Sequence, residues 1–344
     1  MVAKPKLALY WASSCGGCDI AVLGLHEKIL DVAATFEIVF WPCVIDAKIA
    51  DVEMLDNNAI DVCLFNGAIR NDDNAHMAHL LRQKSKVLIA FGSCAFGGAI
   101  PGLANLGDRD KILDWVYYQS PTTDNRSSVW PRSNTKVPEG SLALPAFWNT
   151  VKTLAQVVPV DYFLPGCPPE ASSIEAAVQA IVTGTLPPPG SVIGSDLAVC
   201  DECPRAKQSK KITRFYRPYE IAPDPDACLL DQGLFCAGIA TRGGCGARCP
   251  RVGMGCRGCY GPNAGVYDQG AKLITAIASA IDANTPEEVE AVLDTLPDPA
   301  GYFYRYHLPG SLLRRRALVD APGEHGQHGP VNVPSEAVAQ GGRA

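Results

Sequence analysis

Cysteine is the residue type that dominates the possible chemistry of this sequence. The chain of 344 residues carries 14 cysteines, far more than ordinary packing requires. The N-terminal stretch MVAKPKLALYW runs directly into a strand pattern without the charged and apolar regions of an export signal, so a disulfide framework is disfavoured. Thiols at this density indicate metal ligation, and the question is which metal they hold.

Four of these cysteines each come directly after a predicted strand. Cys15 and Cys18 lie in SSCGGC, Cys94 in FGSCAFGG and Cys167 in LPGCPPE. Because the carboxyl ends of parallel strands share one edge of a sheet, we expect these thiols to converge there. Glycines in the motifs let backbone N–H groups approach sulfur, which suits an anionic iron–sulfur cubane. The residues also allow a redox-active CxxC dithiol or separately buried thiols, but a dithiol leaves Cys94 and Cys167 unexplained.

Eight further cysteines lie in a second, glycine-rich region. They form the motifs CDECPR, CLLDQGLFC and GCGARCPRVGMGCRGCYGP, enough for two four-thiolate sites that suit either zinc or iron–sulfur clusters. The two CxxC pairs are more than fifty residues apart, unlike the paired hairpins of zinc ribbons. Glycine in the last motif, and proline after two of the cysteines, favour cubanes, while zinc stays the alternative. The eight are Cys200, Cys203, Cys228, Cys236, Cys245, Cys249, Cys256 and Cys259.

Alternating strands and helices predict the scaffold that positions the first four thiols. Short apolar runs bounded by glycine, asparagine or proline are typical of buried strands, and helical patterns lie between them. The alternation predicts an α/β fold, a flavodoxin-like doubly wound parallel sheet domain over residues 1–190, with a long irregular insertion at 101–158. The predicted strands are 7–12, 36–41, 62–65, 87–91 and 160–164, and the predicted helices are 20–30, 74–83 and 170–182.

A smaller domain follows the helix-breaking segment GTLPPPGS. Residues 191–319 predict an irregular, iron–sulfur-cluster-binding domain that its ligands must hold together, because little periodicity remains between the cysteines. Helical patterns return at 267–281 and after Thr285, where TPEE is a capping-box signature. Residues 320–344 are polar and rich in proline and glycine, and we expect them to form a flexible tail.

Composition and charge narrow the class of partner. The chain is 47% hydrophobic, which allows a full core, and its net charge is −6. It has no basic field that would follow a phosphate backbone, so we expect no nucleic-acid partner. No run of eighteen apolar residues occurs, so we expect no transmembrane segment and a cytoplasmic protein.

The cysteine motifs together resemble the small subunit of a [NiFe] hydrogenase, and more narrowly the cytoplasmic F420-reducing and F420-non-reducing (methyl-viologen-reducing) type. The resemblance spans about residues 6–315 and rests on SSCGGCDIAVLGL, FGSCAFGG, LPGCPPE and the later cysteine run. It implies an electron-accepting subunit or protein, and a large subunit that carries a nickel–iron centre. It further implies a [4Fe–4S] cluster proximal to that centre, held by Cys15, Cys18, Cys94 and Cys167.

Motif order in this family implies two more clusters, which continue the electron path to the surface. In the exported uptake hydrogenases a histidine precedes the first distal cysteine and the medial site has three thiolates. Here Cys200 stands at the place of that histidine and a fourth medial thiol is present, so we expect three [4Fe–4S] clusters. The distal set is Cys200, Cys203, Cys228 and Cys236, and the medial set, whose separation from the distal set is provisional, is Cys245, Cys249, Cys256 and Cys259.

The resemblance implies electron transfer during reversible H2 oxidation, with no catalytic residue in this chain because the bond is broken on the large subunit. Two other functions stay open: a zinc-stabilised scaffold, and the cluster-bearing subunit of a quinone oxidoreductase, which has adjacent cysteines in its first motif and lacks the later eight. The sequence does not reveal the electron acceptor. Cys43 and Cys63 are predicted to be packing residues, and residues 301–316 are either a docking surface or ordinary packing.

Overall fold

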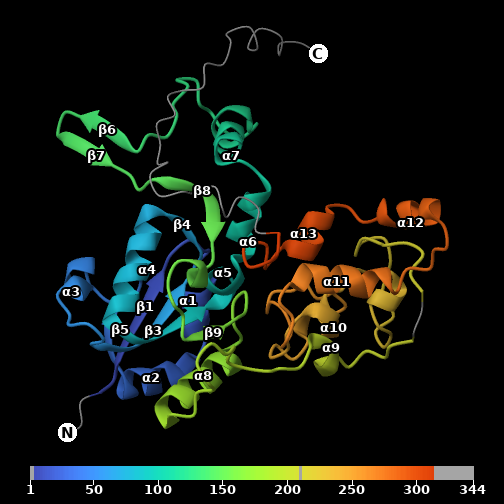
Figure 1. Ribbon diagram of the computed structural model, residues 1–344, viewed down its shortest axis with the longest axis horizontal. Coiled ribbons are helices and arrows are strands. Elements are labelled where there is room, and N and C mark those ends of the chain that lie inside the picture. Colours follow the sequence, from blue (N-terminus) through green and yellow to red (C-terminus); the bar gives the residue numbers. More distant parts are fainter. Residues whose placement is uncertain (1–3, 209–210, 314–344) are drawn as a thin grey trace.

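A parallel sheet forms the centre of the N-terminal region. The computed structural model describes residues 4–208 and 211–313. Its five parallel strands lie in the order β2-β1-β3-β5-β9, with one reversal of direction beside β1 (Figure 1). This order confirms the flavodoxin-like fold class. The strands are β1 (Lys6–Trp11), β2 (Glu37–Phe40), β3 (Ile60–Asn66), β5 (Ser85–Phe91) and β9 (Tyr162–Leu164).

Helices cover both faces of this sheet, which is why the strands are apolar along their length. Helices α1 (Gly17–Leu23), α2 (Ile29–Thr35) and α8 (Ala171–Thr183) pack on the face that carries Leu7 and Leu9. Helices α3 (Ile49–Glu53) and α4 (Asp72–Lys84) pack on the opposite face, which carries Ala8 and Cys63. Alternate residues of β1 therefore enter two separate cores, as the period of a strand requires.

The predicted helix at 20–30 is wrong in its extent. Helix α1 ends at Leu23, and a 3-10 turn at His26–Lys28 separates it from α2. Gly24 follows the last residue of α1, and His26 has a left-handed φ of 55°, which a continuous α-helix does not tolerate. The predicted helices at 74–83 and 170–182 are confirmed as α4 and α8.

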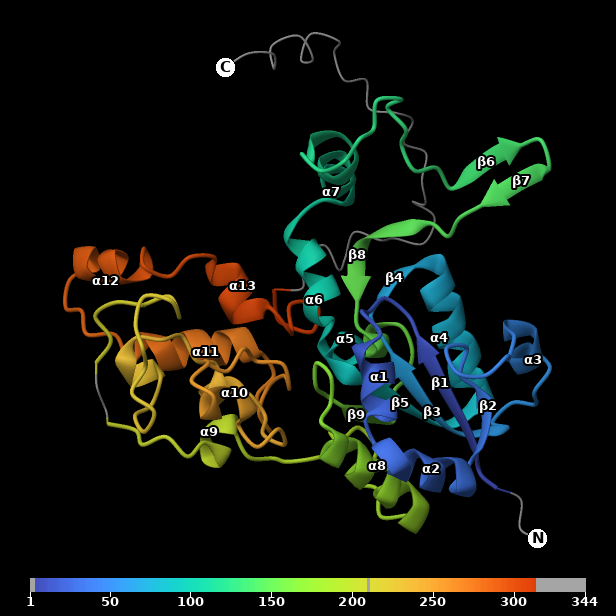
Figure 2. The ribbon, with the colours of Figure 1, turned by 180° about the vertical axis from the view of Figure 1, so that it is seen from behind.

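The insertion at 101–158 is more regular than the sequence predicts. It contains the hairpin of β6 (Asn134–Val137) and β7 (Gly140–Ala143), and β8 (Phe147–Lys152), which pairs with β4 (Ile69–Asn71). Figures 1 and 2 show the hairpin projecting from the sheet domain. Its strands are exposed, so their sequence lacks the apolar alternation that would have predicted them. The short helices α5 (Gly92–Gly97) and α6 (Ala99–Gly102) lead into the insertion, and α7 (Arg109–Asp114) lies within it.

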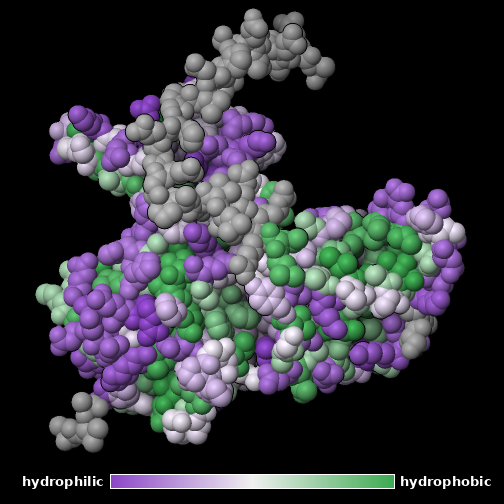
Figure 3. Space-filling view, viewed as in Figure 1, coloured by the Kyte–Doolittle hydropathy of each residue, from purple (hydrophilic) through white to green (hydrophobic). Residues whose placement is uncertain are grey.

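The second region is built from short helices and loops. Its helices are α9 (Val199–Glu202), α10 (Arg248–Arg251), α11 (Gln269–Ala278), α12 (Pro286–Leu293) and α13 (Pro299–Tyr304). The capping box at Thr285 is confirmed, because its side chain accepts a hydrogen bond from the backbone N–H of Glu288. Figure 3 shows hydrophobic side chains on the surface of this region around α11 and α12, where Ile274 and Leu293 are exposed.

The two regions are joined by the segment that follows α13. Pro309 lies against Gly98 and Gly102, and its carbonyl oxygen accepts a hydrogen bond from Gln156 Nε2 at 2.7 Å. His307 packs against Phe96 with 5.4 Å between ring centroids and the rings tilted by 55°. His307 and Pro309 therefore take part in packing between the two regions, whereas Leu312 and Leu313 are exposed. The predicted tail at 320–344 lies outside the described residues.

Among residues 4–208 and 211–313, no helix is both long enough and apolar enough to cross a bilayer. Ser191 and Ile193 still form hydrogen bonds with Phe163 of β9, at 3.1 and 2.8 Å, so the sheet domain reaches slightly beyond the proline-rich segment.

Candidate metal centres

The first four predicted thiols lie together at the carboxyl edge of the sheet. Cys15 and Cys18 lie in the turn after β1 and the start of α1, Cys94 lies in α5 after β5, and Cys167 follows β9. Two hydrogen bonds bind the last two segments to each other: Ser93 N–H donates to Gly166 O at 2.9 Å, and Gly166 N–H donates to Ser93 Oγ at 3.0 Å. The topology thus brings together thiols that are far apart in the sequence.

Burial and mutual proximity shape the acidity of these thiols. Burial, and then the neighbouring Cys167 and Cys15, raise the pKa of Cys94 to about 12. Burial, followed by Cys94 and Cys167, also raises the pKa of Cys18 far above its ordinary value. Burial therefore favours the neutral form of Cys18 and Cys94, and a cluster bound through their thiolates must displace their protons.

Glycine makes room for sulfur at this site. Gly92 has a left-handed φ of 82°, and a Cβ added there would collide with Cys18 Sγ. A Cβ on Gly17 would lie 3.3 Å from Cys15 Sγ. Only glycine combines this backbone conformation with so close an approach to a thiol. The donor set and its glycine cradle fit a cluster bound by four thiolates.

A carboxylate that the sequence analysis missed lies beside this set. Asp19 is buried next to Cys18, and its oxygens accept hydrogen bonds from Trp41 Nε1 at 2.9 Å and Asn66 Nδ2 at 2.8 Å. The two donors come from residues at the ends of β2 and β3, so the network fixes the start of α1 to the sheet edge. No sequence motif marks it, because its members are 22 and 47 residues apart.

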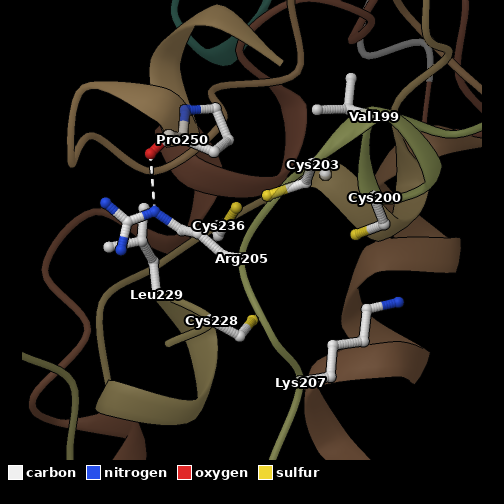
Figure 4. A pocket seen from close by; sticks show the side chains of 10 residues that line it. Val199, Cys200, Cys203, Arg205, Lys207, Cys228, Leu229, Cys236 and Pro250 are labelled. Atoms are coloured by element: carbon white, nitrogen blue, oxygen red, sulfur yellow. Dashed lines mark hydrogen bonds between the residues drawn. The ribbon is translucent and has the colours of Figure 1, made fainter. Parts of the chain in front are cut away.

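A second set of thiols surrounds a cavity in the other region. Figure 4 shows four cysteine sulfur atoms facing a common space. The cavity measures about 350 Å³ including its opening to solvent. Zinc ligands converge on one point at about 2.3 Å, and among residues 4–208 and 211–313 no three or more His, Cys, Asp or Glu side chains are arranged to hold a single metal ion. The thiols are Cys200, Cys203, Cys228 and Cys236.

Two cations contact this cavity. Arg205 is buried, and its guanidinium donates to the carbonyl oxygens of Pro250, Asp224 and Ala227 at 2.7, 2.6 and 3.0 Å. These bonds hold the loops that carry the thiols. Lys207 is exposed and lines the same cavity (Figure 4). Burial raises the pKa of Cys200 to about 12, and the positive charge of Lys207 opposes that rise.

The third set of thiols contacts both of the other sets. Its members are Cys245, Cys249, Cys256 and Cys259. Burial raises the pKa of Cys259 to about 12, with smaller contributions from Cys245, Cys167 and Cys249. At one end of the set, the backbone N–H of Cys167 bonds to the sulfur of Cys259. At the other end, the backbone N–H of Cys256 donates to Cys236 Sγ at 3.3 Å. The third set therefore lies between the first set and the second.

Backbone N–H groups point at several of these sulfur atoms. Ala247 and Arg248 donate to the sulfur of Cys245, which offsets part of the rise in its pKa caused by burial. Gly238 donates to Cys236, and a Cβ on this glycine would lie 3.2 Å from Cys200 Sγ. Such donors stabilise negative charge on thiolates and set the potential of an iron–sulfur cluster. Close approach without a side chain is shown at Gly238, which lies beside the thiols of both Cys236 and Cys200.

The remaining cysteines differ from each other. Cys63 is fully buried in the core between β3 and α4, which confirms its packing role. Cys43 is exposed in the turn after β2, so its prediction as a packing residue is wrong. An apolar strand pattern runs up to Trp41, but the strand ends at Phe40 and the chain turns outward at Pro42. Neither cysteine belongs to one of the three sets.

Known proteins similar to this chain are hydrogenase subunits. An iron–sulfur subunit of the F420-non-reducing hydrogenase of Archaeoglobus profundus is 41% identical over 318 residues, which cover 90% of this chain and 98% of the relative. A subunit of the F420-non-reducing hydrogenase of Methanothermobacter thermautotrophicus (strain Delta H) is 38% identical over 91% of this chain and 97% of the relative. The chain belongs to this family of [NiFe] hydrogenase small subunits. The resemblance inferred from the cysteine motifs is confirmed.

Two further matches concern the sheet domain and the fold. The family described as "NADH ubiquinone oxidoreductase, 20 Kd subunit" matches residues 15–181, a span that excludes the eight later cysteines. A solved [NiFeSe] hydrogenase from Dm. baculatum contains a chain with 16% identity and a TM-score of 0.47, covering 77% of this chain and 96% of that chain. The match over the whole length is thus to hydrogenase subunits, while the sheet domain alone matches the quinone oxidoreductase subunit.

Proposed function

We propose that this chain carries electrons between the nickel–iron centre of a separate large subunit and a redox partner, through three [4Fe–4S] clusters, during reversible H2 oxidation. The observation that supports the proposal most strongly is the serial contact of the three thiol sets. Cys167 touches Cys259, and Cys256 touches Cys236, so no set is isolated from the next. A scaffold stabilised by zinc would need no such continuity.

The proposed ligands keep the assignment made from the sequence. Iron–sulfur clusters supply sites that accept and release one electron at a time. The protein's own residues bind them through thiolates, exclude water by burial and donate N–H groups to sulfur. The proximal ligands are Cys15, Cys18, Cys94 and Cys167, the medial ligands Cys245, Cys249, Cys256 and Cys259, and the distal ligands Cys200, Cys203, Cys228 and Cys236.

The electron balance follows from the reaction on the large subunit. Oxidation of H2 yields two protons and two electrons, and this chain takes the electrons singly. The electron-accepting partner and the cytoplasmic location remain predictions.

Iron content and colour test the proposal. Protein purified anaerobically is expected to be brown, to bleach on addition of dithionite, and to contain about twelve iron atoms per chain. The Cys236→Ala variant is expected to lose about four of them, whereas Cys43→Ala, which changes an exposed cysteine outside the sets, keeps all. Colourless protein that contains zinc would contradict the proposal. A value near four iron atoms in the native chain would contradict the medial and distal clusters of the proposal.

A further inference from the structure

Arg70 is a buried cation without a counter-ion in the described part of the chain. It lies in β4, and only 7% of the residue is exposed. Its guanidinium stacks on the ring of Phe147, 4.4 Å from the centroid. Among the described residues, no carboxylate forms an ion pair with it, and its buried Nε has no hydrogen-bond partner. A buried charge that lacks a partner is costly, because it has lost its hydration without compensation.

The like charge of Arg109 makes the position of Arg70 less favourable still. Burial, and then the like charge of Arg109, lower the pKa of Arg70. Arg109 itself is satisfied, since it donates to Asp110 Oδ1 at 2.8 Å and to the carbonyl oxygen of Phe147 at 2.9 Å. Arginine keeps its charge under all ordinary conditions. This place therefore suits an anion that comes from outside the described chain.

The surroundings of Arg70 connect it to the first cysteine motif. Ser13 and Ala68 form an antiparallel bridge with N–O distances of 3.1 and 3.0 Å, and Ala68 lies two residues before Arg70. Ser13 Oγ also bonds to Asn74 Oδ1 at 2.8 Å, and that same oxygen accepts the backbone N–H of Arg70 at 3.2 Å. The strand that holds Arg70 is thus fixed to the segment that leads into Cys15.

This part of the molecule has the composition of a protein interface. Trp11 and Phe147 are each 43% exposed, and Cys15 is exposed between the strand end and α1. A half-exposed aromatic ring stacked on a desolvated arginine, as Phe147 is on Arg70, is typical of binding hot spots. Figures 1 and 2 both place β4 and β8 beside the carboxyl end of β1, so these residues belong to one edge of the molecule.

We propose that Arg70 is the binding site for an aspartate or glutamate side chain of the hydrogenase large subunit. The inference rests on the proposed function, because electrons from the nickel–iron centre must enter at the first thiol set, beside Ser13. When the subunits assemble, the carboxylate completes an ion pair that is absent from the free chain. Phe147 fixes the plane of the guanidinium by stacking on it, so that two parallel N–H···O bonds can form between Arg70 and the carboxylate.

Zero-length cross-linking tests the pair in the assembled enzyme. Arg70→Lys keeps the charge and supplies a primary amine, which a carbodiimide joins to a carboxylate in contact with it. Mass spectrometry is expected to identify a peptide in which Lys at position 70 is linked to an acidic residue of the large subunit. Arg126→Lys is the control, because Arg126 is exposed and paired with Asp124 at 3.2 Å, so it yields at most a link within this chain.

Subunit affinity gives the second measurement. Arg70→Gln is expected to weaken binding of the large subunit roughly thirtyfold or more, as loss of one member of a buried charge pair does. Arg126→Gln is expected to leave the affinity within about twofold. Iron content of each variant separates the two proposals: an unaltered iron count with unaltered affinity overturns the role of Arg70 alone, whereas iron-free native protein overturns the proposed function.

Two other outcomes would contradict the inference. A cross-link from position 70 to an acidic residue of this same chain would show that the counter-ion is internal. Stabilisation of the native complex by sodium acetate that is lost in Arg70→Gln, together with unaltered subunit affinity, would assign the site to a small anion instead.

Discussion

The two cysteine-rich regions position their thiols in different ways. At the sheet edge, a fold with two large cores positions Cys15, Cys18, Cys94 and Cys167 independently of any ligand. The second region has a smaller apolar core around Phe235 and Leu273, and many of its buried contacts are thiols. A regular fold can therefore place ligands in advance, whereas an irregular segment depends on what its ligands bind.

Removal of iron tests this comparison with the largest expected effect. We expect anaerobic chelation to unfold residues 199–261 and to leave β3 and β5 protected, because the sheet has two large apolar cores without metal whereas the second region has only a smaller one. Hydrogen exchange followed by mass spectrometry measures both regions in one sample. Equal loss of protection in the sheet and in the second region would show that the sheet also depends on its cluster.

A glycine variant tests the first site without removing a ligand. Gly92→Ala is expected to lose the proximal cluster, about one third of the iron, because its Cβ would collide with Cys18 Sγ. Gly265→Ala is the matched control: its φ of 73° is equally left-handed, but nothing lies within 4 Å of the added Cβ. The same iron loss in both variants would mean that backbone strain, and not the approach to sulfur, is responsible.

The segment after α13, which contains His307 and packs between the two regions, is expected to destabilise the folded protein in acid. Burial lowers the pKa of His307 from 6.5 to about 4, although Asp268 opposes this. The unfolded chain therefore takes up the proton first, and stability falls as the pH drops from about 6.5 towards 4, by up to about 3 kcal/mol. His307→Gln is expected to reduce this pH dependence of thermal unfolding. An unaltered profile in the variant would assign the acid sensitivity to other groups.

The smallest effect concerns the charge at the distal cavity. Lys207 is exposed and lowers the pKa of Cys200 against the effect of burial. Removing this positive charge in Lys207→Gln is expected to lower the reduction potential of the distal cluster, since a reduced cluster carries one more negative charge. A redox titration followed by EPR measures the shift. Lys272→Gln, on the exposed side of α11, serves as the control.

The sequence predicts the parts of the molecule that follow from periodicity and topology. Convergence of Cys94 and Cys167 with the first motif could be predicted because parallel strands share a carboxyl edge. The second region has no such rule, and its thiols could be divided into sets only by resemblance. Contacts such as Cys256 with Cys236 depend on loops whose paths the sequence does not determine.

Buried polar partners were beyond the reach of sequence reasoning for another reason. Asp19 and Arg70 look like ordinary charged residues until their burial and their partners are known. Glu202 is similar: it lies between two thiols in the sequence, yet one of its oxygens accepts the N–H of Gly244 at 2.6 Å and fixes the glycine-rich loop. Long-range hydrogen bonds leave no periodic trace in a sequence.

The central claim is that three clusters lie in a row, with the medial one in contact with both others. EPR spectroscopy of the fully reduced protein tests it most directly, by comparing the native chain with Cys249→Ala. We predict magnetic coupling among three reduced clusters in the native protein, and two uncoupled signals in the variant. Two signals that stay coupled after loss of the medial cluster, or fewer than three clusters in the native chain, would contradict the account.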